Sequence, residues 1–273
     1  MKRNRLFPDR YGPWALILGA SEGLGAAFAQ ALAGRGMNLL LVARRGELLA
    51  RLADSCRQRF GVEALCLAAD LAAPGFTERL QAAAEGLELG VVVYNAAYAP
   101  VGGFLSVEAE DLSRVIEVNV RAPVLILRSL LPSMAARGRG AVILMSSLAS
   151  GQGTPRIATY AASKAFNRIL AEGLWFELKD SGIDAIACCA GAIRTPGYAS
   201  AGGREAPGAR DPAFVAERAI RSLGHGPIAI PGFVNAAAAW VMGRLLPRRA
   251  AIGLMAGSTS GLRQPPSSRG ERA

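Results

Sequence analysis

Short apolar segments alternate with longer segments of helical periodicity along most of the chain. Strands that are covered by helices on both faces are apolar throughout, so this alternation predicts βαβ units around a parallel sheet. The predicted strands are residues 14–20, 38–43, 63–69, 90–94, 141–146, 183–189 and 227–230. We therefore expect an α/β fold, a Rossmann-type doubly wound parallel sheet of about seven strands, with ligands at the strand carboxyl ends.

The segments between these strands have the spacing of amphipathic helices. The predicted helices cover residues 24–33, the segment from the second strand through 59, residues 108–136, residues 158–179 and residues 213–223. The helix over 108–136 should be bent or interrupted near Pro123, because proline lacks the backbone N–H that continues a helix. Residues 191–212 are rich in Gly, Ala and Pro, and we expect them to form a mobile loop over the site.

The pattern predicts one domain over residues 1–256, with a core at 12–230. Residues 232–256 read as an Ala-rich apolar helical extension that ends in Pro247, Arg248 and Arg249, and the Ser-, Gly-, Pro- and Arg-rich residues 257–273 as a disordered tail. The uninterrupted apolar part, 233–243, is too short to span a bilayer. We expect the extension to pack against the domain or a partner subunit, and peripheral membrane contact is the alternative.

Charge and composition narrow the classes of partner. The formal net charge is +10, but the arginines are spread along the chain and aromatic residues make up only 6%, which leaves little for base stacking. We therefore expect no nucleic-acid site, although a basic surface would attract anionic cofactors. The four cysteines show no CxxC spacing and there is one histidine, so no metal site is predicted. Unpaired cysteines and the lack of an evident signal peptide favour a cytoplasmic protein.

A glycine-rich turn joins the first predicted strand to the first helix. Gly19, Gly23 and Gly25 give the spacing GxxxGxG, with Ser21 and Leu24 in the same turn. Glycines let the backbone approach a phosphate closely, and the following helix N-terminus offers free N–H groups and a positive dipole. This placement favours a dinucleotide site, whereas the alternative is a turn with a purely structural role.

The end of the second strand bears on the choice of cofactor. Enzymes that use NAD usually place an acid there to bind the ribose hydroxyls. Arg44 and Arg45 stand at this point instead, and a guanidinium matches a 2′-phosphate in charge and geometry. We therefore favour NADP(H), with NAD(H) as the alternative, and note that Glu22 on the same turn would repel a phosphate mildly.

A candidate reaction centre lies around the fifth strand. Tyr160 and Lys164 are four residues apart, so they share one face of the predicted helix. A neighbouring ammonium should lower the pKa of a tyrosine from about 10 and make it a usable acid or base. Ser147 ends the preceding strand and can hydrogen-bond a substrate oxygen. The alternative is a surface tyrosine and lysine one helical turn apart.

The order and spacing of these motifs resemble the short-chain dehydrogenase/reductase family, and most of all its DltE-like bacterial branch. The likeness covers about residues 12–230 and rests on the 19–25 turn, Asp70, Asn95 and Ala96, Asn119, Ser147, Tyr160 and Lys164, and residues 191–195. No single motif is decisive, but their ordered combination is specific.

The resemblance implies roles for the catalytic set. Tyr160 would be the general acid/base and Ser147 would position the substrate oxygen. Lys164 would bind the nicotinamide ribose, and Asn119 would hold a water that connects Lys164 to solvent. The implied activity is hydride transfer between a nicotinamide and a carbonyl or secondary alcohol.

The resemblance also implies the rest of the cofactor site. Asp70 would contact the adenine amino group, Leu71 would line its pocket, and Thr195 would hydrogen-bond the carboxamide. Asn95, Ala96, Gly191 and Ile193 complete this set. The family pattern is altered at Leu18, Ala97 and Ala190, which bears on the tightness of cofactor binding more than on the reaction.

Substrate and assembly are less determined. Residues near the predicted reaction centre are mostly apolar. No arginine is obviously placed to bind a carboxylate, although Arg156 and Arg194 are nearby. We therefore expect the substrate to be a hydrophobic carbonyl compound or alcohol. The helices at about 108–136 and 158–179 would pair subunits into a homodimer or homotetramer, as in relatives. Two other classes stay open: a non-catalytic dinucleotide-binding sensor or scaffold, and a membrane-surface binding protein.

Overall fold

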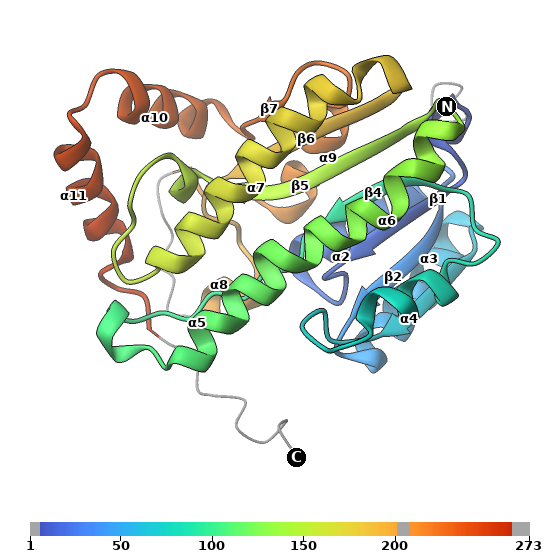
Figure 1. Ribbon diagram of the computed structural model, residues 1–273, viewed down its shortest axis with the longest axis horizontal. Helices are drawn as coiled ribbons and strands as arrows, with labels where there is room; N and C mark the ends of the chain where they lie inside the picture. The colour runs from blue at the N-terminus through green and yellow to red at the C-terminus, as the bar shows by residue number, and fades with distance from the viewer. Residues whose placement is uncertain (1–5, 201–207, 264–273) are drawn as a thin grey trace.

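A single parallel sheet organises the chain, as seen in a computed structural model that describes residues 6–200 and 208–263 (Figure 1). Within these residues the seven strands lie in the order β3-β2-β1-β4-β5-β6-β7. Their bounds are β1 (Trp14–Leu18), β2 (Asn38–Ala43), β3 (Ala64–Ala68), β4 (Leu89–Tyr94), β5 (Gly140–Ser147), β6 (Ile183–Ala190) and β7 (Ile228–Ala229). The predicted doubly wound sheet is confirmed, and its order reverses between β1 and β4, where such folds bind ligands.

Helices cover both faces of the sheet, which explains why the strands are apolar throughout. One face packs against α2 (Gly23–Ala33), α3 (Gly46–Phe60) and α9 (Pro212–Arg221). The other face packs against α4 (Phe76–Ala83), α6 (Ala122–Ala136) and α7 (Ala158–Glu177) (Figure 1). All residues of β1 and β4 are buried, so the segments that follow these strands extend from a closely packed part of the core.

The helix predicted over 108–136 is interrupted before Pro123, as expected. It consists of α5 (Ala109–Ile116), a π-helical turn η2 (Glu117–Arg121) and α6. Pro123 has no N–H to donate to the carbonyl four residues back, which belongs to Asn119. The side chain of Asn167 on α7 donates to that carbonyl instead, at 3.1 Å. This hydrogen bond connects α7 to Asn119, the residue expected to act in the proton relay.

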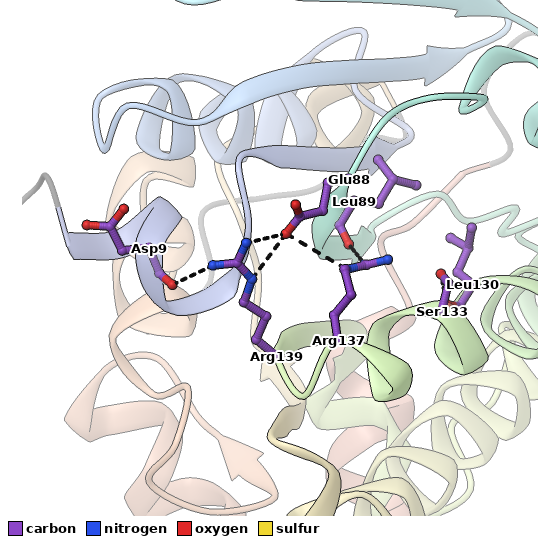
Figure 2. Close-up of polar contacts among 7 residues, drawn as sticks. All are labelled: Asp9, Glu88, Leu89, Leu130, Ser133, Arg137 and Arg139. Atoms are coloured by element: carbon purple, nitrogen blue, oxygen red, sulfur yellow. Dashed lines mark hydrogen bonds and ion pairs between the residues drawn. The ribbon is translucent and has the colours of Figure 1, made fainter.

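The ends of β4 and β5 far from the site are held by charged side chains (Figure 2). Glu88 pairs with Arg139 at 2.6 Å and lies 3.8 Å from Arg137. Arg139 also donates to the carbonyl of Asp9 at 3.0 Å, and Arg137 to that of Leu89 at 2.8 Å. Both arginines follow α6, so this cluster fixes the return of the chain into β5.

The C-terminal extension differs from the prediction. The Ala-rich helix expected to end at Pro247 to Arg249 is α10 (Phe233–Arg244), and a second helix that was not expected, α11 (Arg248–Thr259), follows it. Pro247 separates them, because proline lacks a donor and disfavours helical geometry in the residue before it. Helix α11 runs to Thr259, past the expected start of the disordered tail, and residues 264–273 of that tail lie outside the described chain.

Hydrogen bonds hold the C-terminal extension next to the loop that precedes α7. Thr259 donates to the carbonyl of Pro155 at 2.9 Å, and Arg156 donates to that of Leu262 at 2.8 Å. Helices α10 and α11 lie at the end of the molecule away from α3 and α4 (Figure 1). Each helix of residues 6–200 and 208–263 is too short or too polar to cross a bilayer.

The predicted loop 191–212 contains some regular structure. Helix α8 (Pro196–Ser200) and a parallel bridge between Ile193 and Arg210 lie in its described parts. Residues 201–207 fall outside the described residues.

Candidate active site

The glycine turn is shaped by contacts that leave no room for side chains. Gly19 has a φ of +79°, and a Cβ there would lie 2.7 Å from the backbone of Ala96. A Cβ on Gly25 would lie 2.0 Å from the carbonyl oxygen of Gly19. The Asn95 side chain donates to the same carbonyl at 2.9 Å. Strand β4 therefore supports the turn after β1 through Asn95 and Ala96.

The start of α2 is open to an anion. Among the described residues, no side chain caps the first N–H groups of α2, since Glu22 at the N-cap makes no such bond. Unpaired N–H groups and the helix dipole at such a point favour phosphate. With the close-packed glycines, this geometry fits the pyrophosphate of a dinucleotide.

The loop after β6 reaches this turn. A Cβ on Gly23, whose φ is +57°, would lie 3.0 Å from the Thr195 side chain. Gly191 stands at the other end of the same stretch, where a Cβ would lie 2.9 Å from Asn235 of α10. Ile193 packs against the buried core between them. The stretch expected to hold the nicotinamide end therefore connects the turn to α10.

The arginines at the end of β2 have different surroundings. Arg45 pairs with Glu22 at 2.8 Å and donates to Ser21 at 2.9 Å. Arg44 has no hydrogen bond or ion pair within the described part of the chain. The pairing neutralises Glu22, the residue expected to repel a 2′-phosphate, and leaves Arg44 available for one.

Asp70 is held ionised after β3, with Leu71 packed beside it against the core. Burial would raise the pKa of Asp70, but the N–H of Ala72 at 3.0 Å and the guanidinium of Arg114 outweigh it, and Arg44 adds to the lowering. An ionised carboxylate can accept from an amino group. The sequence did not indicate Arg114 as the partner of Asp70, because Arg114 belongs to α5 and lies 44 residues further along the chain.

Ser147, Tyr160 and Lys164 meet at the carboxyl end of β5. The Lys164 ammonium lies 5.5 Å from the centre of the Tyr160 ring and donates to the carbonyl of Met145 at 2.9 Å. Ser146 donates to the carbonyl of Lys164 at 2.8 Å, which fixes α7 against β5. Lys164 is 2% exposed, whereas Tyr160 and Ser147 are half-buried.

The pKa values of Tyr160 and Lys164 differ from the expectation. Burial raises the pKa of Tyr160 to about 12, and a hydrogen bond with Ser147 only partly opposes this. Burial lowers the pKa of Lys164 to about 8. The predicted lowering of the tyrosine pKa by lysine is absent here, because loss of solvent penalises both charged forms. Tyr160 is therefore protonated at neutral pH and can serve as a proton donor.

Asn119 connects the π turn to the reaction centre. Its side-chain oxygen accepts from the N–H of Tyr98 at 2.8 Å, and its amide donates to Ser163 at 2.9 Å. Ser163 in turn donates to the carbonyl of Tyr160 at 2.7 Å. Sequence reasoning gave no role to Ser163 or Asn167. The proline four residues after Asn119 was the one local signal that the Asn119 carbonyl needed another donor.

Comparisons with known proteins agree with this geometry. Residues 13–205 match the model of the family described as short chain dehydrogenase. A 7beta-hydroxysteroid dehydrogenase from Clostridium sardiniense is 35% identical over 190 residues, which cover 70% of this chain and 73% of that protein.

Two solved structures extend the likeness. A structure from work on 7beta-hydroxysteroid dehydrogenase stereoselectivity has a TM-score of 0.86 at 32% identity and covers 91% of this chain and 98% of its own. A short-chain dehydrogenase from Sphingobium yanoikuyae, in complex with NADPH, has a TM-score of 0.76 at 30% identity, covering 94% and 99%.

The fold and the site define an oxidoreductase with a Rossmann-type NAD(P)-binding sheet. The chain belongs to the short-chain dehydrogenase family.

Proposed function

We propose that this chain is an NADP(H)-dependent oxidoreductase that interconverts a hydrophobic carbonyl compound and its secondary alcohol. The observation that carries the proposal is that Ser147, Tyr160 and Lys164 lie together at the end of β5. The same chain also has a glycine turn before α2 whose N–H groups are not capped by a side chain. A dinucleotide sensor would need the turn but would not need this acid–base set.

The chain's own groups account for the proton. In the direction of reduction, Tyr160 donates its hydroxyl proton to the carbonyl oxygen, while Ser147 hydrogen-bonds that oxygen. The Lys164 ammonium, 5.5 Å from the centre of the Tyr160 ring, would return a proton to the tyrosine, and a water held by Asn119 would connect Lys164 to solvent. A bound nicotinamide supplies or accepts the hydride. The residues proposed to hold it are those of the glycine turn, Asn95 and Ala96, and Thr195.

The preference for NADP(H) rests on charge at the end of β2. The strand is followed by Arg44 and Arg45 with no acid to bind ribose hydroxyls. The Arg45–Glu22 pair offsets the negative charge of Glu22, and a similar solved structure is a complex with NADPH. A substrate with a bulky apolar body is supported by relatives named for hydroxysteroids.

Titration of the protein with NADPH and with NADH, followed by nicotinamide fluorescence, tests the cofactor. NADPH should bind at least about tenfold more tightly, since a charge-assisted hydrogen bond contributes about 1.5–3 kcal/mol. Arg44→Ala should remove most of that difference, whereas Arg249→Ala, a change of an exposed arginine on α11, should leave it intact. Equal weakening of both nucleotides by Arg44→Ala would contradict a role at the 2′-phosphate.

Assembly is a second part of the proposal. Helices α6 and α7 expose large apolar side chains on the face turned away from the sheet: Val124, Leu125, Phe166, Ile169, Trp175 and Phe176. Monomeric proteins rarely expose such a row, which is typical of a protein–protein interface. We propose that these two helices pair subunits into a homodimer.

A further inference from the structure

A cavity of about 650 Å³ lies beside the reaction centre, under helix α10. It extends from Ser147 and the following turn η3 (Leu148–Gly151) to the last residues of α10. The volume is in the range of pockets that hold a drug-sized molecule. Ser147 lines the cavity, whereas Tyr160 and Lys164 do not, so the cavity adjoins the proposed acid–base set at Ser147.

Most of the cavity wall is apolar. Ile228 and Ile230 line it from the edge of the sheet, and Trp240, Met242 and Leu246 line it from α10 and the turn that follows. Such a wall suits a rigid or extended hydrocarbon body. An apolar wall of this kind suits a molecule with hydroxyls on all sides poorly.

Three arginines from three different helices also line the cavity: Arg168 on α7, Arg244 on α10 and Arg248 on α11. Arg168 pairs with Glu172 at 3.0 Å, and Arg248 donates to the carbonyl of Gly151 at 2.8 Å. Within the described residues Arg244 has no hydrogen bond or ion pair. No Asp or Glu of the described chain lines the cavity, so the charged groups in its wall are these three arginines.

The surrounding sequence strengthens this charge. Residues 231–263, which form α10, α11 and their flanks, contain four arginines and no acidic residue. A guanidinium without a protein partner at the rim of an apolar cavity matches a carboxylate, which it can bind through two parallel hydrogen bonds. A neutral ligand of the same shape would gain less from Arg244, because its hydrogen bond would lack the charge of a carboxylate.

We propose that the cavity binds an amphipathic substrate: a ketone or secondary alcohol on an apolar body that ends in a carboxylate. The oxygen to be reduced or oxidised lies at Ser147, the apolar body lies along Ile228, Ile230 and Trp240, and the carboxylate is bound by Arg244 with Arg248 nearby. This inference rests on the proposed oxidoreductase activity and adds the charge of the substrate to it.

The test compares long-chain keto acids with their methyl esters, which keep the length and the ketone but lack the charge. With NADPH present, kcat/KM for the acid should exceed that for the ester by about tenfold or more, the effect of one charge-assisted hydrogen bond. Arg244→Ala should bring the ratio close to one, and Arg244→Glu should favour the ester. Arg249→Ala removes a neighbouring arginine that does not line the cavity, so it should keep the wild-type ratio.

The outcomes separate this inference from the proposed function. Equal turnover of acid and ester by the wild type, or an unchanged ratio in both Arg244 variants, would overturn the substrate class while the oxidoreductase activity stands. If neither compound is reduced, calorimetric titration of the NADPH-loaded protein with the same acid and ester decides. Tighter binding of the acid that is lost in Arg244→Ala supports the site, and equal binding overturns it.

Discussion

Lys164 combines a chemical role with a cost in stability. Its side chain is nearly fully buried, and one carbonyl, that of Met145, accepts from its ammonium at 2.9 Å. The pKa of about 8 in the folded chain lies below the unfolded value of about 10.4. Between these values the unfolded chain binds more protons, so stability rises with pH across this window. The charged lysine therefore destabilises the fold at neutral pH.

We expect Lys164→Met to raise the free energy of unfolding at pH 7 by about 1–3 kcal/mol, less than the full pKa shift implies because the bond to Met145 is lost. The gain should fade as pH rises from about 8 through about 10.4, because above this window the wild-type lysine is neutral in both states. Urea denaturation of the cofactor-free protein at pH 7 and pH 10 measures this. The exposed Lys179→Met serves as control and should show no such pH-dependent gain; a loss of stability at pH 7 in Lys164→Met would contradict the interpretation.

Tyr160 is the residue on which turnover should depend most. Phenylalanine keeps the ring that lies beside Lys164 and removes only the hydroxyl that transfers the proton. General acid–base catalysis contributes about 10²–10⁴ in rate, so kcat of Tyr160→Phe should fall by that factor. Nicotinamide fluorescence should show nearly unchanged NADPH binding. A variant that retains most of its turnover would assign the proton to another group.

At this scale the sequence indicated the identity of the reacting groups but not their protonation. A tyrosine and a lysine four residues apart can be read from the chain. The pKa of each depends on how much water reaches it, which is set by β5, η3 and α7 together. Partners such as Ser163 and Asn167 were missed for the same reason, since their contacts bridge distant segments.

Helix α2 shows how an element is positioned by the absence of a side chain. It begins at the glycine turn and packs so closely that Gly25 touches the backbone of Gly19 and Ala20. The residue spacing predicted the turn, and the contact explains why the third glycine is required. A larger residue would push the first turn of α2 away from β1, and the N–H groups proposed for phosphate would move with it.

We expect Gly25→Ala to lower the free energy of unfolding by about 3 kcal/mol or more, because the new Cβ would overlap backbone atoms that cannot move aside. It should also weaken nucleotide binding. Gly253→Ala on α11 is the matched control, since nothing lies within 4 Å of its added Cβ. That change should stabilise the chain by about 0.5–1 kcal/mol through helix propensity. Denaturation curves of the two variants compare them, and equal effects would contradict the packing argument.

At the scale of the whole molecule, the exposed apolar side chains of α6 and α7 are the feature that supports the proposed dimer. The outward faces of α6 and α7 expose apolar residues, with Ile169 at 64% and Phe176 at 61%. These residues lie on α6 and α7, two helices that cover the same face of the sheet (Figure 1). The same exposure without a partner would be an aggregation risk.

We expect Ile169→Glu to convert a dimer into a monomer, because a buried charge at such an interface costs several kcal/mol. Size-exclusion chromatography with light scattering measures the mass. Leu254→Glu, on α11 and 59% exposed, is the control and should leave the mass unchanged. A wild-type chain that is monomeric at micromolar concentration would contradict the interface, as would a dimer that survives Ile169→Glu.

The sequence by itself determined what depends on neighbours along the chain. Alternating apolar runs and helical periods specify the seven strands, the glycine spacing specifies the turn after β1, and Pro123 specifies the interruption before α6. Each is a local consequence of side-chain period or backbone freedom, so each can be read without knowing the fold. The end of the Ala-rich helix near Pro247 was equally local, whereas the second helix after it, α11, was not predicted.

Only the tertiary structure decided what depends on distant segments lying together. The sequence showed no arginine placed to bind a carboxylate, yet the fold brings Arg168, Arg244 and Arg248 to one cavity that reaches Ser147. It also excludes water from Lys164 and Tyr160, which sets their pKa values against the expectation. Desolvation and convergence arise when separate elements pack against each other, and no pattern along the chain encodes either one directly.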